Sequence, residues 1–213
     1  MKVFISSELE ANHPLVTASN SLGFQLIQHS LLSFSAVDGV PTQPYDLVFF
    51  SSPRAYAFGR QFILPETKVA CVSEGTARHI QHPIHWCGNS PSKPTQTALE
   101  FKQWVGERRV LFPISSRSLG SISSAFPPEQ MECLTVYRTI LNPRVIESCT
   151  VYIFTSPSNA EAFLLQNTIP GGAKVIAKGT STQEFLQQHG IESTYFTDES
   201  IHWEEALAPW VNP

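Results

Sequence analysis

The stretch Asp46–Phe58 reads DLVFFSSPRAYAF, and it has an echo at Cys149–Phe163, CTVYIFTSPSNAEAF. Each copy begins with a continuous apolar run, which is typical of a strand covered on both faces in a parallel sheet. Each run ends in Ser-Pro, at Ser52-Pro53 and at Ser156-Pro157. Serine suits the N-cap of a helix, and proline suits the first helical turn, where a missing N–H costs nothing. Both stretches therefore predict a strand that passes directly into a helix.

Each of these two stretches is followed by a further segment, and the number of residues between stretch and segment is nearly the same in both cases. These segments are KVACVSEGTA at Lys68–Ala77 and KVIAKGTSTQ at Lys174–Gln183. The spacing is 24 residues from Ser52 to Thr76 and 26 residues from Ser156 to Thr182. Two matched pairs in register favour a duplicated α/β domain with paired sites, whereas a chance repeat of an ordinary βα pattern is the alternative.

The remainder of the chain alternates between strand and helix patterns. Strands are expected at 2–6, 24–29, 46–51, 68–72, 84–87, 109–114, 131–137, 149–155, 174–178 and 193–196, and helices at 15–22 (ending near Gly23), about 54–62, about 76–81, 95–105, about 118–125, from 157, 182–188 and 200–210. Segments 31–37 and 134–140 read as extended connectors that pair with each other. Each half of this pattern predicts a five-stranded sheet.

We expect two similar α/β domains with doubly wound, flavodoxin-like parallel sheets. One domain is discontinuous (1–31 and 142–213), and the other is inserted (38–136). The connectors, about 32–37 and 137–141, are expected to form a two-stranded antiparallel link. Because the chain crosses twice, this link predicts a hinge with a ligand cleft between the domains.

Composition narrows the class of protein. The 213 residues are 42% hydrophobic and carry a net charge of −4 without a dense Lys/Arg stripe, which argues against binding to nucleic acid or to a membrane surface. No apolar run approaches the roughly 20 residues of a membrane span, and the N-terminus lacks the apolar region of a signal peptide. We therefore expect a cytoplasmic protein, and a monomer because no exposed apolar stripe is evident.

The four cysteines stand singly in apolar segments and read as small buried thiols. They are Cys71, Cys87, Cys133 and Cys149. The histidines His79, His82 and His85 beside Cys87 imitate a metal site, but a helix end, a His-Pro break and a strand separate them, so convergent ligands are not expected. Dinucleotide, P-loop, serine-hydrolase and zinc-protease motifs are absent from the sequence. No cofactor and no metal are expected.

The strongest candidate site lies at the turns that carry Ser52, Thr76, Ser156 and Thr182. At the carboxyl ends of parallel strands, helix N-termini present free N–H groups and the positive end of the helix dipole. Hydroxyl groups add donors there. These turns therefore predict binding of an elongated ligand with several carboxylates, and simple helix capping is the alternative.

Three further features support that site. Arg54 follows Pro53 and could bind a carboxylate, although a solvated surface arginine is the competing interpretation. Ser115, Ser116 and Arg117 form another polar turn after a strand. Tyr137 lies in the returning connector, where a phenol could act as a donor or weak acid, although tyrosine is also common in strands for structural reasons.

In these segments the chain resembles the uroporphyrinogen-III synthase family over nearly its whole length. The matching motifs are KVFISS, DLVFFSSPRA, KVACVSEGTA, RVLFPISS, LTVYRTI, YIFTSPSNAEAF and KVIAKGTSTQEFLQQHGI. The resemblance implies a HemD-like fold and a cofactor-free, cyclising lyase of porphyrin (haem and sirohaem) biosynthesis. The substrate that the resemblance implies is hydroxymethylbilane, which hydroxymethylbilane synthase could hand over. The implied product is uroporphyrinogen III, formed with loss of water and inversion of the last pyrrole ring through a spiro intermediate.

The resemblance also implies roles for individual residues. Tyr137 would assist departure of the terminal hydroxyl, and Arg54 matches an arginine found after Ser-Pro in some members. Contacts to substrate carboxylates fall on Ser52, Thr76, Ser156 and Thr182, with Ser181 as a neighbour.

This chain departs from the family at three places. Ser73-Glu74 puts a carboxylate beside a proposed anion site, the Ser115–Arg117 turn is serine-rich, and Lys178 replaces a residue that is usually apolar.

Two other functions would suit the same pattern. A non-catalytic, hinge-bending sensor module would have the same domains, and Tyr137 with the paired turns is what favours an enzyme. A flavodoxin-like nucleotide or flavin binder would need a phosphate loop after the first strand. This chain has two acidic residues there, Glu8 and Glu10, which disfavours that function.

Overall fold

The chain folds into two compact α/β units in a computed structural model that describes residues 1–89, 94–196 and 201–211. The first unit comprises Met1–Ser33 and Ile140–Pro213, and the second comprises Phe34–Thr139. Within the described parts of the chain, no helix is both long and apolar enough to span a membrane.

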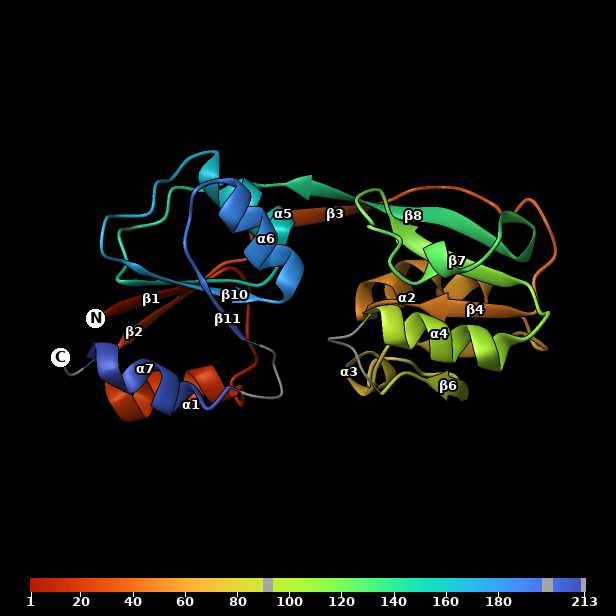
Figure 1. Ribbon diagram of the computed structural model, residues 1–213, viewed down its shortest axis with the longest axis horizontal. Coiled ribbons are helices and arrows are strands. Elements are labelled where there is room, and N and C mark those ends of the chain that lie inside the picture. The colour runs from red at the N-terminus through yellow and green to blue at the C-terminus, as the bar shows by residue number, and fades with distance from the viewer. Residues whose placement is uncertain (90–93, 197–200, 212–213) are drawn as a thin grey trace. The chain divides into compact units, whose positions relative to one another are not determined.

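The first unit is built on a five-stranded sheet in the order β11-β10-β9-β1-β2, in which every pairing is parallel. Its strands are β1 (Lys2–Ile5), β2 (Gln25–Gln28), β9 (Val151–Phe154), β10 (Lys174–Lys178) and β11 (Thr194–Phe196). Its helices are α1 (Pro14–Leu22), α5 (Pro157–Leu164), α6 (Thr180–Gln188) and α7 (Trp203–Val211). Helices α1 and α7 cover one face of the sheet, and α5 and α6 cover the other (Figure 1).

Alternate residues of the central strands belong to two separate hydrophobic cores, one on each face of the sheet in this unit. Phe4 and Tyr152 pack toward α5 and α6, whereas Val3 and Val151 pack toward α1 and α7. Since side chains of a strand alternate between its faces, a strand that is buried on both faces must be apolar throughout. Val151–Phe154 is fully buried, which explains the continuous apolar run.

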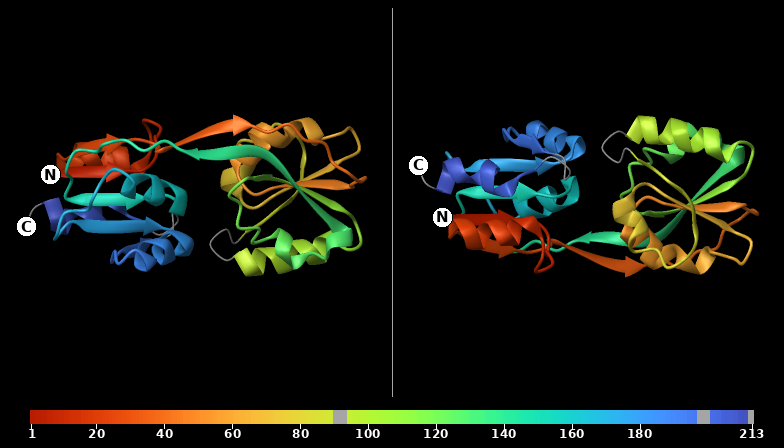
Figure 2. Two further views of the ribbon diagram at one scale, coloured as in Figure 1. Left: turned by 90° about the horizontal axis from the view of Figure 1, so that it is seen from above. Right: turned by 90° about the horizontal axis from the view of Figure 1, so that it is seen from below.

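The second unit contains a six-stranded sheet in the order β3-β8-β7-β4-β5-β6. Its strands are β3 (Leu32–Ala36), β4 (Leu47–Phe50), β5 (Lys68–Cys71), β6 (Ile84–Cys87), β7 (Val110–Ser115) and β8 (Met131–Leu141). Its helices are α2 (Pro53–Gly59), α3 (Glu74–Ala77) and α4 (Pro94–Val105), with 3₁₀ turns at Arg60–Phe62, Ser123–Ala125 and Pro128–Gln130. Helix α4 packs on one face of the sheet and α2 on the other (Figure 2).

Gly59 allows α2 to pack closely against its sheet. A Cβ at this position would stand 2.5 Å from Cβ of Pro113 in β7, so only glycine lets the helix approach so closely. This close packing determines where the beginning of α2, with Ser52 and Arg54, lies relative to β7 and β8.

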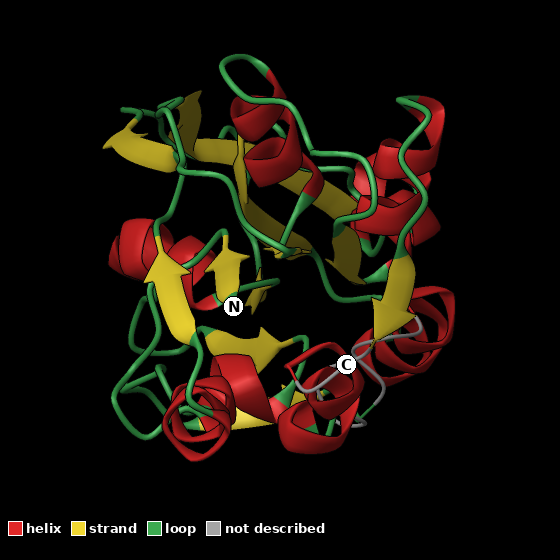
Figure 3. Cartoon of the chain, turned by 90° about the vertical axis from the view of Figure 1, so that its left-hand side faces the viewer, coloured by secondary structure: helices red, strands yellow, loops and turns green. Residues whose placement is uncertain are grey.

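The two sheets share one spatial order once the first unit is read from a different starting strand. Reading β9, β10, β11, β1 and β2 as strands one to five gives the order 3-2-1-4-5, and reading β4 to β8 gives the same order. The paired stretches found in the sequence occupy equivalent strands, β4 with β9 and β5 with β10. The units are thus circular permutations of one topology, which supports duplication. In Figure 3 the strands of both units are drawn in yellow and their flanking helices in red.

The predicted mixed α/β class with doubly wound parallel sheets is confirmed, and so is the C-cap at Gly23, whose φ is +70°. The extended connectors also pair: Asn142 N donates to Leu31 O, and Val37 N donates to Val136 O, a pattern that runs antiparallel.

Other element predictions need correction. Residues 118–125 do not form an α-helix, because Gly120 takes a left-handed φ of +66° and only Ser123–Ala125 forms a 3₁₀ turn. The helix expected at 76–81 is the short α3, Glu74–Ala77. The strand expected at 131–137 and its connector are one continuous strand, β8. The second sheet therefore has six strands, with β3 at its edge, instead of five. Residue 200, the predicted start of the last helix, lies outside the described residues, and α7 begins at Trp203.

Candidate functional site

Ser52 caps α2 at the carboxyl end of β4. Its backbone is extended (φ −164°, ψ 161°), and its Oγ accepts a hydrogen bond from Ala55 N at 3.0 Å. Pro53 begins the helix as predicted. A serine hydroxyl that accepts from a helix N–H still has its own proton to donate. Ser52 therefore caps the helix and can also donate to a ligand, so the two interpretations of this residue are compatible.

Ser156 repeats this arrangement in the first unit with stronger constraint. Its φ and ψ are −162° and 158°, and its Oγ accepts from both Asn159 N (3.2 Å) and Asn159 Nδ2 (3.1 Å). Asn159 is buried and is anchored by Leu31 N, which donates to its Oδ1 at 2.9 Å. Because Asn159 donates to the Ser156 hydroxyl twice, the cap uses that hydroxyl only as an acceptor, and its proton is available for donation to a ligand. Asn159 is a supporting residue that the sequence analysis did not identify.

The two threonines of the paired turns are deeply buried. Thr76 is 3% exposed and Thr182 is 1% exposed. The Thr182 hydroxyl donates to the carbonyl of Lys178 at 3.1 Å and so ties the end of β10 to the first turn of α6. Ser181 is half-buried, and it lies nearer to solvent in this turn. Gly179, with φ of +99°, makes the sharp turn between strand and helix.

The charged departures lie at the same edges of the sheets. Glu74 is exposed in the first turn of α3, where the helix dipole favours its carboxylate and where it would repel a ligand carboxylate. Lys178 is half-buried at the end of β10.

Tyr137 lies in an aromatic cluster of the second unit. Its side chain is only 7% exposed. Its ring stacks on Phe58 (centroids 5.0 Å apart, planes at 19°) and meets Phe34 edge-on (6.0 Å, 68°). Tyr137 also follows an irregularity in strand pairing: Ile114 pairs with Thr135, whereas Ser115 pairs with Tyr137. Such bulges redirect a side chain and are common beside active sites.

Arg54 contacts the same cluster. Its Cζ lies 3.5 Å from the centroid of the Phe34 ring, a cation–π contact. Burial of the guanidinium lowers the pKa of Arg54 from its ordinary value, and the nearby Tyr137 opposes this shift. Among the described residues, no carboxylate forms an ion pair with Arg54.

The serine-rich turn, Ser115–Arg117, forms hydrogen bonds with β8. Ser116 N donates to Tyr137 O at 2.9 Å, and Thr139 N approaches Ser116 Oγ at 3.4 Å. Ser115 Oγ accepts from Arg117 N at 3.0 Å. Ser116 and Arg117 are exposed. The structure thus brings Arg54, Tyr137 and the Ser115–Arg117 turn to one edge of the second unit.

Two of the histidines that imitate a metal site, His82 and His85, form hydrogen bonds within the second unit. His82 Nδ1 lies 3.0 Å from the hydroxyl of the buried Tyr56, and His85 Nδ1 accepts from Val69 N at 3.2 Å. Across the described residues, no group of three or more His, Cys, Asp or Glu side chains converges in a way that could hold a metal ion.

Two of the cysteine thiols are strongly perturbed. Burial raises the pKa of Cys71 to about 12, with the neighbouring Cys87 adding to the effect, and burial raises the pKa of Cys149 to about 11. All four cysteines are free, as predicted, but only Cys71 and Cys149 are buried, whereas Cys87 is half-buried and Cys133 is exposed.

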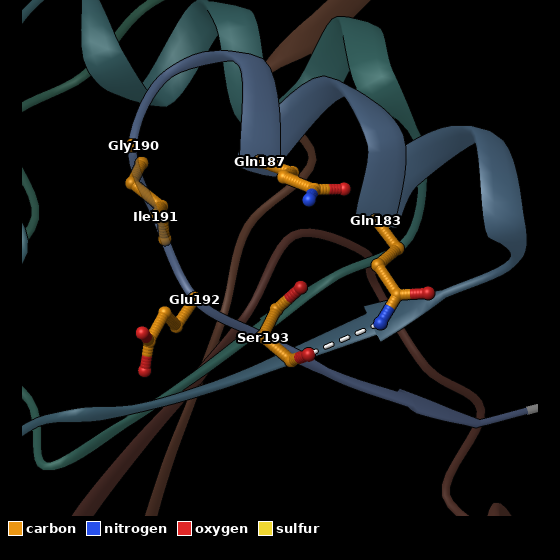
Figure 4. A pocket seen from close by; sticks show the side chains of 6 residues that line it. All are labelled: Gln183, Gln187, Gly190, Ile191, Glu192 and Ser193. Atoms are coloured by element: carbon orange, nitrogen blue, oxygen red, sulfur yellow. Dashed lines mark hydrogen bonds between the residues drawn. The ribbon is translucent and has the colours of Figure 1, made fainter.

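Hollows border these elements in the described part of the chain. A hollow of about 520 Å³ beside α2 is lined by Arg54, Phe58, Arg60 and His79 among others, and a smaller one of about 250 Å³ adjoins the Ser118–Ser123 loop. A third, of about 610 Å³, lies along α6 and the loop after it (Figure 4). There Gln183 Nε2 donates to Ser193 O at 3.2 Å, and Ser193 Oγ is buried with no hydrogen-bond partner among the residues that the structure describes. The sequence analysis did not single out this third hollow.

Comparison with known proteins identifies similar sequences and folds. The family model described as uroporphyrinogen-III synthase HemD matches residues 14–200. The uroporphyrinogen-III synthetase of Helicobacter pylori 26695 superposes with a TM-score of 0.68 at 19% identity, covering 99% of both chains. A mutant uroporphyrinogen III synthase from the extremely thermophilic bacterium Thermus thermophilus superposes with a TM-score of 0.58 at 15% identity, covering 99% of this chain and 97% of that one. No curated protein matches the chain in sequence.

Proposed function

The chain belongs to the uroporphyrinogen-III synthase family, and from that premise we propose how its residues handle the substrate. The enzyme is a cyclising lyase of tetrapyrrole biosynthesis. Its substrate, hydroxymethylbilane, is a linear tetrapyrrole with carboxylates on every ring. In our proposal Ser52 and Ser156 donate their hydroxyl protons to these carboxylates. The observation that carries the proposal is the matched capping geometry of the two serines, which leaves one donor proton free in each unit.

The neighbouring groups have distinct parts in this proposal. Carboxylates of the substrate are bound in the second unit by Arg54, Ser116 and Arg117. In the first unit, Ser181 binds a substrate carboxylate. At the threonine turns the ligand contact comes mainly from backbone N–H groups. The hydroxyls of Thr76 and Thr182 hold those turns in shape, an assignment supported by their burial and by the bond from Thr182 to Lys178 O.

Tyr137 is the proposed proton donor in the first chemical step. The C–O bond of the terminal hydroxymethyl group breaks, the phenol protonates the departing hydroxyl to give water, and an azafulvene remains. The substituted α-carbon of the last pyrrole ring, at the other end of the chain, then attacks the methylene carbon of the azafulvene to give the spiro intermediate. The older bond from that carbon to its methylene bridge breaks, and the free α-carbon of the same last ring forms a new bond to the bridge. The proton released on rearomatisation restores the phenol. Since free hydroxymethylbilane also closes without inversion, the protein's main task is to hold the ends of the chain so that the spiro path is faster.

The site proposed here contains no metal ligand and no cofactor. The protein supplies hydrogen-bond donors, cationic side chains and one phenol, and all of these are side chains or backbone groups of the chain itself.

We also propose that the protein acts as a cytoplasmic monomer that receives hydroxymethylbilane directly from the synthase that makes it. Spontaneous closure of the free substrate favours direct transfer. The large exposed hydrophobic side chains among the described residues come singly from separate segments of the chain, which favours a monomer. Light scattering at increasing protein concentration tests the monomer.

Product analysis tests the function. Purified protein is incubated with freshly generated hydroxymethylbilane, the products are oxidised, and uroporphyrins I and III are separated by chromatography. We expect mainly the type III isomer without added cofactor or metal. Type I alone, formed at the rate of the protein-free control, would instead support a non-catalytic binding module.

A further inference from the structure

Phe34 of β3 contacts both Arg54 and Tyr137. The Arg54 guanidinium lies over the face of its ring at 3.5 Å from the centroid, and the Tyr137 ring meets it at 68° with centroids 6.0 Å apart. Phe34 is half-buried and comes from the segment that precedes the second unit's first parallel strand. It therefore links a residue of α2 to a residue of β8, although the three lie far apart in sequence.

The geometry suits the charge distribution of an aromatic ring. The face of the ring is negative and attracts a cation, whereas the edge is positive and favours a tilted contact with a second ring. Arg54 lies over the face, and the planes of Phe34 and Tyr137 are strongly tilted. Leucine is also a large apolar residue, but it offers neither interaction.

Arg54 needs such support because it is a partly desolvated cation. Burial lowers its pKa, and among the residues that the structure describes no carboxylate pairs with it. A cation held without an anion is ready to accept one from a ligand. Without the ring beneath it, the long arginine side chain would gain conformational freedom and the bound geometry would be lost more often.

Tyr137 is held from two sides. Phe58 stacks on it with planes at 19°, and Phe34 packs against it from a second direction. Since a phenol assists departure of a hydroxyl only when it lies within hydrogen-bond reach, freedom of the ring to move would cost rate rather than affinity.

We propose that Phe34 is a positioning residue that holds Arg54 and Tyr137 in fixed relation. In this way a carboxylate bound by Arg54 places the terminal hydroxymethyl group against the phenol. This inference rests on the proposed function, because it takes Arg54 as a carboxylate-binding residue and Tyr137 as the proton donor. It assigns Phe34 no contact with substrate. Phe34 acts through its two neighbours.

The first test compares Phe34→Leu with the wild type. We expect kcat for type III formation to fall about three- to tenfold, from loss of a cation–π contact worth about 1 kcal/mol, and the share of type I product to rise. Phe34→Tyr and Phe34→Trp keep an aromatic face and should restore most of the activity. Phe185→Leu is the matched control, since Phe185 is also half-buried but lies on α6 in the other unit, and its kcat should stay within about twofold of the wild type.

The second test separates positioning from packing. Because Phe34 acts through both Arg54 and Tyr137, Phe34→Leu should cause a smaller loss of kcat in an Arg54→Gln background than in the wild type. An undiminished loss in that background overturns the proposal, as does a folded Phe34→Leu variant that retains wild-type kcat. Failure of the aromatic variants to restore kcat, with circular dichroism showing an intact fold, also overturns it. If the wild type forms no type III product, it is the proposed function that fails.

Discussion

Thr182→Val separates a structural role from a ligand contact at the turn between β10 and α6. Valine has nearly the shape of threonine but lacks the hydroxyl. In the structure that hydroxyl donates to Lys178 O at 3.1 Å, and the residue is 1% exposed. The substitution leaves a carbonyl oxygen without this partner in a dry environment. We therefore expect a loss of stability with little loss of turnover per folded molecule.

The size of the effect follows from the burial. Removing one partner of a buried hydrogen bond costs about 1–3 kcal/mol. For a chain of this size, each kcal/mol lowers the melting temperature by about 2–4 °C, so a decrease of about 2–12 °C is expected. Circular dichroism during heating measures the decrease, and product analysis well below the melting transition measures turnover of the folded fraction.

Ser181→Ala is the matched control in the same turn. Ser181 is half-buried, so its loss should change stability by less than about 0.5 kcal/mol while raising KM for hydroxymethylbilane. The reasoning is refuted if Thr182→Val melts like the wild type but has lost turnover, because the hydroxyl would then contact the substrate.

Three other outcomes can be measured directly. Tyr137→Phe should slow type III formation on the order of 10²-fold with the fold intact, and unchanged turnover would remove this phenol from the mechanism. Ser52→Ala and Ser156→Ala should each lower the free energy of unfolding by about 0.5–2 kcal/mol through loss of a cap and should also raise KM; a change in stability alone would leave them as caps. The raised pKa of Cys71 means that its thiol ionises more readily in the unfolded chain, so its contribution to stability is complete below about pH 9 and is lost as pH rises toward 12. Melting curves at about pH 8 and about pH 10 should therefore differ less in Cys71→Ala than in the wild type, whereas Cys133→Ala, at an exposed position, should behave like the wild type.

Much of the fold could be predicted because its signals are local. A run of apolar residues followed by Ser-Pro specifies a buried strand, a cap and a helix start within a short stretch of chain, and both such turns form at Ser52 and Ser156. Gly23 and Gly190 end their helices with positive φ, which only a residue without Cβ adopts freely. The repeat was visible in the sequence because both copies form the same local structure, a buried strand followed by a serine cap and a helix that begins with proline.

One local prediction failed for a local reason. Residues 118–125 have helical spacing, but Gly120 adopts a left-handed conformation and its carbonyl accepts from Ser123 Oγ at 3.2 Å. A compact turn replaces the helix there.

The site was harder to predict because burial and contact depend on residues distant in sequence. Thr182 looked like an available donor, yet its hydroxyl is used within the turn. Asn159 looked like an ordinary helix residue, yet it donates twice to the hydroxyl of Ser156. These hydrogen bonds are themselves local, but the burial of Thr182 and the bond from Leu31 N that holds the Asn159 side chain depend on segments distant in sequence.

The sequence alone therefore determined the strands, the capped turns and the family, because each depends on hydrophobic periodicity or on motifs of a few residues. Only the tertiary structure decided the circularly permuted order of the two sheets and the cluster that joins Phe34, Arg54 and Tyr137. These depend on which strands pair and which faces meet. That choice is made by packing between segments dozens of residues apart, and no local pattern encodes it.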